Sequence, residues 1–122
     1  MIISLHSFGF KYGSQVADYL WDVRFLANPY WVPELKPYSG RHAEVAAYVL
    51  ANEAGIRFLS LVEPLLVFLL QEHAARGREA VSLAVGCTGG RHRSVAVVEH
   101  LGCFLVNRDL SPRIDHRDIN KE

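Results

Sequence analysis

The stretch AVSLAVGCTGGRHRSVAVV, residues 80–98, decides the fold. It starts with a short apolar run, passes through a segment rich in glycine and basic residues, and ends in a second apolar run. A short, continuous apolar run is typical of a central strand that is buried on both faces. From about Arg91 onwards, the pattern predicts a helix that is apolar on most sides. The stretch therefore predicts a strand–loop–helix unit of an α/β fold.

The flanking sequence supplies the other elements of such a fold. Strands are expected at 2–8, 18–26 and 113–119, helices at 41–53 and 56–76, and a proline-rich structured loop at 27–40. This order predicts a small open, mostly parallel sheet of about four strands with helices on both faces. Binding sites in sheets of this kind lie beyond the carboxyl ends of the strands.

Composition and charge limit the classes of function. The 122 residues fit a single domain spanning 1–122, and 50% of them are hydrophobic. Lys plus Arg and Asp plus Glu number 13 each, so no global field attracts nucleic acid or an anionic membrane. Two cysteines, the absence of a signal-peptide pattern and the lack of a long apolar stretch indicate a soluble cytoplasmic protein.

The loop GCTGGRHRS (86–94) has the composition of an anion-binding site. Glycines allow successive backbone amides to turn inward, and the first amides of the following helix favour negative charge. An arginine at the helix start adds a bidentate grip on phosphate, and hydroxyl groups add donors. The expected cradle comprises Gly86, Thr88, Gly89, Gly90, Arg93 and Ser94. The alternative is a tight strand-to-helix turn with exposed arginines.

Four residues match the pattern C-x-x-G-x-x-R-S: Cys87, Gly90, Arg93 and Ser94. This loop resembles the signature of cysteine-dependent protein tyrosine phosphatases, which implies a Cys87 thiolate as nucleophile and Arg93 as phosphate clamp. The sequence departs from that family at Gly86, where a histidine is usual, and no obvious loop presents an aspartic general acid; the candidates for that role are Asp22 and Asp118. The other interpretation of Cys87 is a small residue that fills the turn.

Four longer segments match the C-terminal domain of the RapZ family in order and spacing: SFGFKYG (7–13), DVRFLANPYW (22–31), GCTGGRHRSV (86–95) and HRD (116–118). The chain thus resembles a family of bacterial RNase adapter proteins that bind a small regulatory RNA. The resemblance implies a fold likened to a phosphofructokinase subdomain, a pocket that senses glucosamine-6-phosphate, and homo-oligomeric assembly. Carried over by position, the family's pocket falls on Asp22, Arg24, Asn28, Tyr30, Thr88, Gly89, His92 and Arg93.

The chain also departs from the family. Tyr30 stands where the enteric members have a histidine, and a phenol cannot become a cation near neutral pH. These 122 residues contain no match to the family's N-terminal ATPase domain, so no ATP chemistry is expected of them. The basic tail is reduced, which weakens any RNA binding because RNA affinity depends on phosphate neutralisation. The residues left for weak RNA binding are Arg91, Arg113, Arg117 and Lys121.

Three hypotheses follow from the sequence. The leading one is a non-catalytic module that binds an amino sugar phosphate between the loop and Asp22 and presents a surface to a small RNA, an RNase or a separate ATPase subunit. The second is a phosphatase that uses Cys87 and Arg93, and the third is an RNA adapter without a metabolite. No metal site and no cofactor are expected, since no histidine or cysteine spacing is typical of ligands. Asp115, Arg117 and Asp118 are equally consistent with a solvated strand edge.

Overall fold

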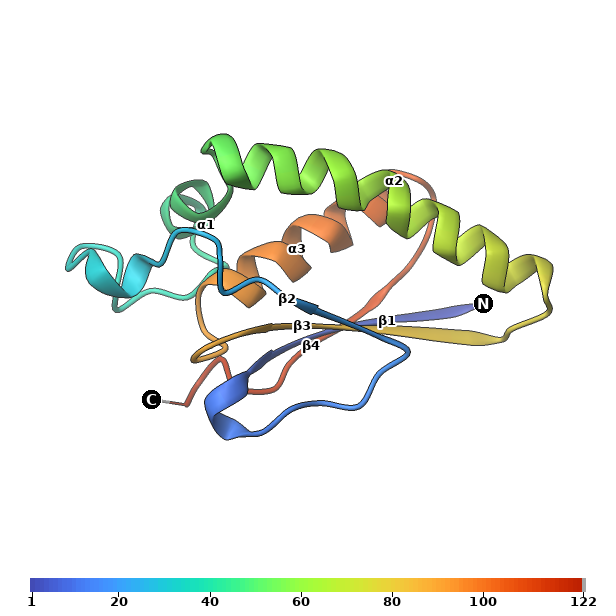
Figure 1. Ribbon diagram of the computed structural model, residues 1–122, viewed down its shortest axis with the longest axis horizontal. Coiled ribbons are helices and arrows are strands. Elements are labelled where there is room, and N and C mark those ends of the chain that lie inside the picture. Colours follow the sequence, from blue (N-terminus) through green and yellow to red (C-terminus); the bar gives the residue numbers. More distant parts are fainter. Residues whose placement is uncertain (122) are drawn as a thin grey trace.

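Parallel pairing of strands from distant parts of the chain builds the sheet. In the computed structural model, which describes residues 1–121, four strands form the sheet: β1 (Ile2–Gly9), β2 (Tyr19–Asp22), β3 (Ala80–Cys87) and β4 (Arg113–His116). Their order is β2–β3–β1–β4, and every neighbouring pair is parallel (Figure 1). The expected open α/β sheet is confirmed, with β1 and β3 at its centre.

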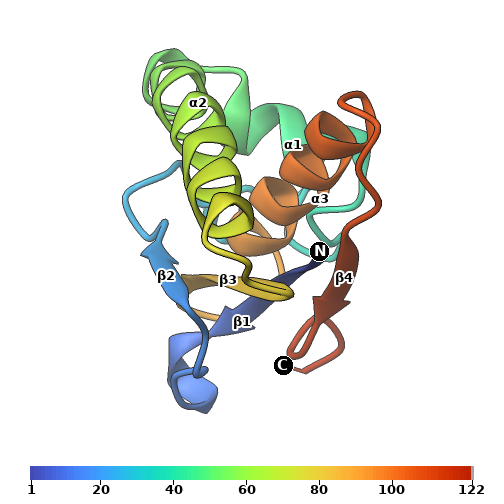
Figure 2. The same ribbon diagram turned by 90° about the vertical axis from the view of Figure 1, so that its right-hand side faces the viewer.

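Three α-helices are described, and Figure 2 shows them together on one face of the sheet. They are α1 (Ala43–Leu50), α2 (Glu53–Ala75) and α3 (Arg93–Val106), and α3 packs across the two central strands. The opposite face carries the short 3-10 helix η1 (Phe10–Tyr12) and the chain that leads from it to β2. The distribution of the helices therefore differs from the expectation of helices on both faces.

The side-chain pattern of the central strands explains this one-sided arrangement. On the helix side, the buried residues of β1 and β3 include Ile3, Leu5, Val81 and Leu83. On the other side, Ser82 of β3 is only half-buried, and its backbone amide and hydroxyl both contact Asp18. The same face carries Ser4 and His6, so it has less apolar surface to remove from water than the helix side, and η1 and the chain after it suffice to cover Phe8 and Ala84 there.

The second strand is shorter than the expected 18–26. After Asp22 the chain turns, and the amide of Leu26 donates to the carbonyl of Val23. The turn buries Leu26 and leaves Phe25 exposed, so the strict alternation of the sequence ends here. The proline-rich loop contains a second 3-10 helix, η2 (Pro29–Trp31), whose first turn is capped by the side chain of Asn28.

Two histidines connect neighbouring elements of the fold. The imidazole of His116 on β4 contacts the Ser7 hydroxyl of β1 at 2.6 Å and the Glu99 carboxylate of α3 at 2.8 Å. His100 of α3 likewise contacts Glu63 of α2 at 2.8 Å. These imidazoles act as structural hydrogen-bonding groups between packed elements.

The two central strands end in a backbone-on-backbone contact. A Cβ atom on Gly90 would lie 2.5 Å from the amide nitrogen of Gly9, and one on Gly9 would lie 2.5 Å from the carbonyl carbon of Gly89. Gly90 also has a φ of +74°, in the left-handed region that favours glycine. Side chains at these positions would push the loop after β3 away from the end of β1.

We predict that Gly90→Ala lowers the free energy of unfolding by about 3 kcal/mol, because left-handed strain and steric overlap with the backbone add together. Gly77→Ala is the matched control, since Gly77 has a φ of +76° but open space around its α-carbon. Its expected cost is about 1 kcal/mol from strain alone. Urea unfolding of both variants measures the difference, and equal losses would contradict the role given to the backbone contact.

Candidate functional site

A cavity of about 980 Å³ opens where β1 and β3 end. Its walls come from residues 87–89 and 91–93 of the glycine loop, from Lys11 after β1, from the segment 28–37 and from Lys121 near the C-terminus. This is the edge of the sheet where the sequence places the site. The predicted site residues that line the cavity are Asn28, Tyr30, Cys87, Thr88, Gly89, His92 and Arg93.

The lining of this cavity, called the cationic cavity below, carries charge of one sign. Its basic residues are Lys11, Lys36, Arg91, Arg93 and Lys121, and none of the described lining residues is acidic. They come from separate segments, and the fold brings them together. A concave site with low-dielectric walls concentrates such a field, so positive potential gathers at this cavity although the formal net charge of the protein is zero.

Arg93 lines the cavity and also connects neighbouring segments of the fold through hydrogen bonds. Its side chain is only 6% exposed, and Nη1 donates to the carbonyl oxygens of Arg24 at 2.5 Å and Leu26 at 3.5 Å. Nη2 lies 3.4 Å from the Thr88 hydroxyl in the glycine loop. The guanidinium thus joins the turn after β2 to the start of α3. A guanidinium has five N–H donors, so some remain for a ligand.

Asp22 and Arg24 lie outside the cavity lining. They form a bidentate ion pair with each other, with an Nη2–Oδ2 distance of 2.7 Å. The hydrogen bonds from Arg24 hold the pKa of Asp22 below its usual value, and the nearby charge of Arg93 adds to this effect. Asp22 is therefore ionised at neutral pH and already paired.

Cys87 lies at the bottom of the glycine loop and is almost completely buried. The Gly90 amide donates to its Sγ at 3.3 Å, and the Ser94 hydroxyl lies 3.2 Å from the same sulfur. The loop therefore turns around the thiol. Gly86 has a packing role instead: it lies within β3, and a Cβ atom there would meet the Phe8 ring at 2.5 Å.

His92 and Lys36 connect the glycine loop to the proline-rich segment. The Nε2–H group of His92 donates to the carbonyl oxygen of Lys36 at 3.0 Å. Burial lowers the pKa of His92, and the neighbouring charges of Arg91 and Arg93 lower it further. At neutral pH the ring is therefore an uncharged structural contact.

An aromatic pair forms the outer wall of the cationic cavity. The rings of Tyr30 and Trp31 meet edge to face with centroids 4.9 Å apart, and Trp31 is 76% exposed. The ammonium group of Lys36 lies 4.2 Å from the centroid of the Tyr30 ring. Tyr30 thus holds a cation through its ring face, a contact for which its phenol needs no charge of its own.

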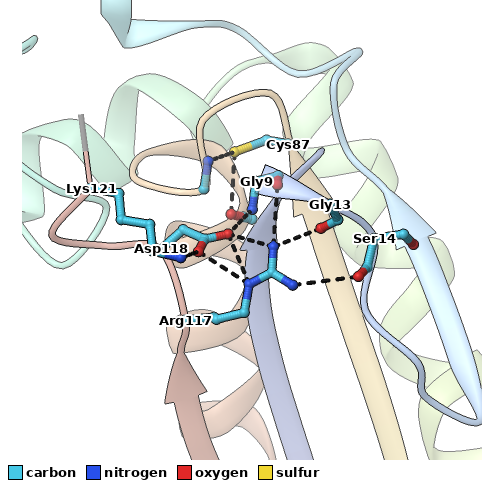
Figure 3. Close-up of polar contacts among 9 residues, drawn as sticks. Gly9, Gly13, Ser14, Cys87, Arg117, Asp118 and Lys121 are labelled. Carbon is cyan, nitrogen blue, oxygen red and sulfur yellow. Dashed lines mark hydrogen bonds and ion pairs between the residues drawn. The ribbon is translucent and has the colours of Figure 1, made fainter. Parts of the chain in front are cut away.

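Asp118 is the functional candidate whose surroundings the sequence did not reveal. Its side chain is fully buried, so the interpretation as part of a solvated strand edge is wrong for this residue. Figure 3 shows its carboxylate between Arg117, Lys121 and the backbone of Gly9. The Gly9 amide donates to Oδ2 at 2.7 Å, Arg117 Nη2 lies 2.8 Å from Oδ2, and Lys121 Nζ lies 2.7 Å from Oδ1. In the sequence, the HRD motif (116–118) was the one feature that pointed to this residue.

The two carboxylates named as general acids are both held ionised. Burial raises the pKa of Asp118, but the hydrogen bonds from Arg117, Lys121 and the Gly9 amide outweigh it and hold the pKa at about 2. The pKa of Asp22 is lowered as well. A general acid near neutral pH needs a raised pKa, so neither group has the required protonation state.

The basic residues predicted to bind RNA lie in different places. Arg91 donates to the carbonyl oxygens of Pro37 and Ile119, and it lines the cationic cavity with Lys121. Arg117 is held by Asp118 and by the carbonyl of Gly13. Arg113 begins β4 beside Ser4, near the middle of β1.

The described part of the chain lacks two further features. Between residues 1 and 121, no helix has the length and apolar character needed to cross a bilayer. Within the same range, no cluster of three or more histidine, cysteine, aspartate or glutamate side chains is arranged to hold a metal ion. The distinguishing chemical feature of the site is therefore the set of basic side chains that line the cavity.

Fold and cavity together define an open, parallel α/β domain with a cationic cavity at the carboxyl end of its sheet. A family model described as the RapZ C-terminal domain matches residues 1–120, and the chain belongs to this family. The resemblance of the sequence segments is thereby confirmed.

Similar proteins extend well beyond the part that matches. A nucleotide-binding protein of Mycobacteroides abscessus is 45% identical over 122 residues, which cover 98% of this chain and 40% of that protein. A protein of the same description from Cutibacterium acnes is 47% identical over 117 residues, covering 95% and 40% respectively. One from Geotalea daltonii is 42% identical, with 99% and 43% covered. The chain spans about 40% of the length of these relatives.

The ionised state of Asp118 predicts a pH dependence of stability. Folding lowers its pKa from 3.8 to about 2, so its contribution is present above the unfolded value and is lost as the pH falls toward 2. The expected size is about 2 kcal/mol. Urea unfolding at several pH values between about 5 and 2 should give a flatter profile for Asp118→Asn than for the wild type. The pH dependence that remains in the variant is expected from Asp18 and Asp22, whose pKa values are also lowered. Identical slopes would contradict the assignment.

Proposed function

We propose that this domain is a non-catalytic binding module for a phosphorylated small metabolite. The observation that carries the proposal is the gathering of five basic side chains around one cavity whose described lining has no carboxylate. The glycine loop adds backbone amides and the Thr88 hydroxyl beside the start of α3, where the helix dipole favours an anion. A phosphate group is the ligand chemistry that uses all of these donors.

The simplest ligand is an amino sugar phosphate such as glucosamine-6-phosphate, as the family resemblance implies. Hydroxyl groups of a sugar have partners in Asn28, Tyr30 and Thr88, which line the same cavity. Asp22 is not among the lining residues, so recognition of the ligand amine by this carboxylate has no support. The printed name of the relatives makes nucleotides the first competitors to test, although these relatives are much longer than this chain.

We further propose that occupancy of the cavity alters a partner surface. The exposed Trp31 lies at the cavity edge, where a bound ligand and a partner can both contact it. The proposed partners are a small RNA, an RNase or a separate ATPase subunit. The domain is further proposed to form homo-oligomers and to act in the cytoplasm. RNA affinity would have to draw on Arg91 and Lys121, which line the cavity, because Arg113 and Arg117 lie outside the lining.

Phosphorus NMR of glucosamine-6-phosphate tests the binding module directly. We expect the signal to broaden or shift on addition of the protein, without growth of inorganic phosphate. Lys11→Ala and Lys36→Ala should each weaken binding by about tenfold to a hundredfold, since a charge-assisted phosphate contact contributes about 1.5–3 kcal/mol. Arg57→Ala is the matched control, because Arg57 is an exposed cation of α2 outside the lining.

Arg93 is less suitable for this test, since its loss would leave the carbonyls of Arg24 and Leu26 unpaired and disturb the fold. A spectrum that does not change with the wild-type protein, for the sugar phosphate or for a panel of nucleotides and inorganic phosphate, would refute the proposal. Equal effects of Lys36→Ala and Arg57→Ala would place the anion elsewhere.

The second candidate is a cysteine-dependent phosphatase, favoured by one specific observation. Cys87 Sγ has the Gly90 amide and the Ser94 hydroxyl as partners, an arrangement that can stabilise a thiolate. Against it stand the ionised states of Asp22 and Asp118 and the burial of the thiol.

We expect no release of inorganic phosphate by the wild-type protein in the same NMR time course, and unchanged ligand binding in Cys87→Ser. Serine keeps a small polar side chain at the turn but is a much weaker nucleophile than a thiolate. Phosphate release that Cys87→Ser abolishes would make the loop an active site and would replace the binding-module proposal.

A further inference from the structure

A buried carboxylate lies beside the cationic cavity, although its charge alone would repel an anion. Lys121, which lines the cavity, has its Nζ 2.7 Å from Oδ1 of Asp118. Unit charges at this range interact strongly in a partly buried site. A site built for anions would gain from losing this carboxylate unless the carboxylate itself holds something in place.

The two cations of Asp118 face different directions, as Figure 3 shows. The guanidinium of Arg117 is turned toward the backbone after β1, where its Nη2 donates to the Gly13 carbonyl at 2.6 Å and its Nη1 to the Ser14 carbonyl at 3.4 Å. Lys121 lines the cavity instead, and its ammonium also lies 5.0 Å from the centroid of the Tyr12 ring. Arg117 thus neutralises the carboxylate on one side, while Lys121 places its charge at the wall of the cavity.

The carboxylate is itself fixed by the backbone around it. The Gly9 amide donates to Oδ2 at 2.7 Å. A Cβ atom on Gly90 would lie 3.0 Å from Cβ of Asp118, so Asp118 is packed directly behind the glycine loop. A free lysine side chain has about 2 kcal/mol of rotamer entropy to lose on ordering, and a fixed carboxylate removes part of that cost before the ligand arrives.

We infer that Asp118 is a positioning residue of the anion site, which holds the Lys121 ammonium at the wall of the cationic cavity while Arg117 balances its charge from the far side. The inference rests on the proposed function and adds a determinant of affinity that touches no ligand. It assigns a role to the last residue of the HRD motif.

The direction in which one substitution changes the phosphate affinity distinguishes a positioning role from a purely electrostatic one. Asp118→Asn removes a negative charge near the cavity and keeps an oxygen that can accept from the Gly9 amide. If only charge mattered, inorganic phosphate would bind more tightly to the variant; if Asp118 positions Lys121, phosphate binds about tenfold more weakly. Asp115→Asn is the control, because this exposed residue of β4 carries the same charge and lies outside the lining. Its phosphate affinity should match the wild type or exceed it slightly.

A double-mutant cycle shows whether the effect passes through Lys121. Calorimetric titration with inorganic phosphate is carried out on the wild type, Asp118→Asn, Lys121→Met and the double variant, with circular dichroism as the check of folding. We expect each single variant to lose about tenfold in affinity and the double variant to lose no more than either. A purely structural role of Asp118 would weaken phosphate binding to the same extent in the Lys121→Met background.

The outcomes separate this inference from the proposed function. A wild-type protein that binds no phosphate, sugar phosphate or nucleotide overturns both. A wild-type protein that binds, with Asp118→Asn equal or tighter, overturns only the positioning role, as does an additive double variant. If Asp118→Asn does not fold, Asp118→Glu takes its place in the cycle, because it keeps the charge but displaces the carboxylate from Lys121; phosphate binding equal to the wild type, or a loss that persists in the Lys121→Met background, would overturn the inference.

Discussion

The close contact of Gly9 with Gly89 and Gly90 is the constraint on which the rest of the site depends. It places the ends of β1 and β3 so close together that no side chain fits between the two backbones. The segments that leave these ends then diverge and form the walls of one cavity. Asp118 closes the arrangement from the C-terminal side, because it accepts from the Gly9 amide and packs against the glycine loop.

Charge is distributed unevenly in a protein that is neutral as a whole. Several carboxylates are engaged with neighbouring basic or imidazole groups away from the cavity, such as Asp22 with Arg24, Asp18 with Arg78 and Glu63 with His100. The basic residues of the cavity, apart from Lys121, have no ion pair described among residues 1–121. The positive potential at the cavity therefore arises because these acidic residues pair with partners elsewhere in the fold. The amino-acid composition alone does not reveal this distribution.

Much of the architecture could be predicted because it depends on local patterns. The apolar run before the glycine loop, the helical spacing of 56–76 and the prolines of 27–40 each led to the element found there. The expectation failed where tertiary contacts overrode the pattern. The strand at 18–26 ends at Asp22, because Arg24 and Leu26 turn their carbonyls toward Arg93. Helices on the second face were unnecessary, because that face is partly polar.

The sequence by itself determined the class of fold, the family and the position of the glycine-rich loop at the carboxyl end of a strand, because strand and helix periodicity, glycine spacing and long shared motifs are local properties of the chain. Only the tertiary structure decided which charges meet. It brought Lys11, Lys36 and Lys121 to the loop, kept Asp22 outside the cavity lining and buried Asp118. These outcomes depend on the parallel register of distant strands and on hydrogen bonds between residues as far apart as Gly9 and Asp118, which no local pattern encodes.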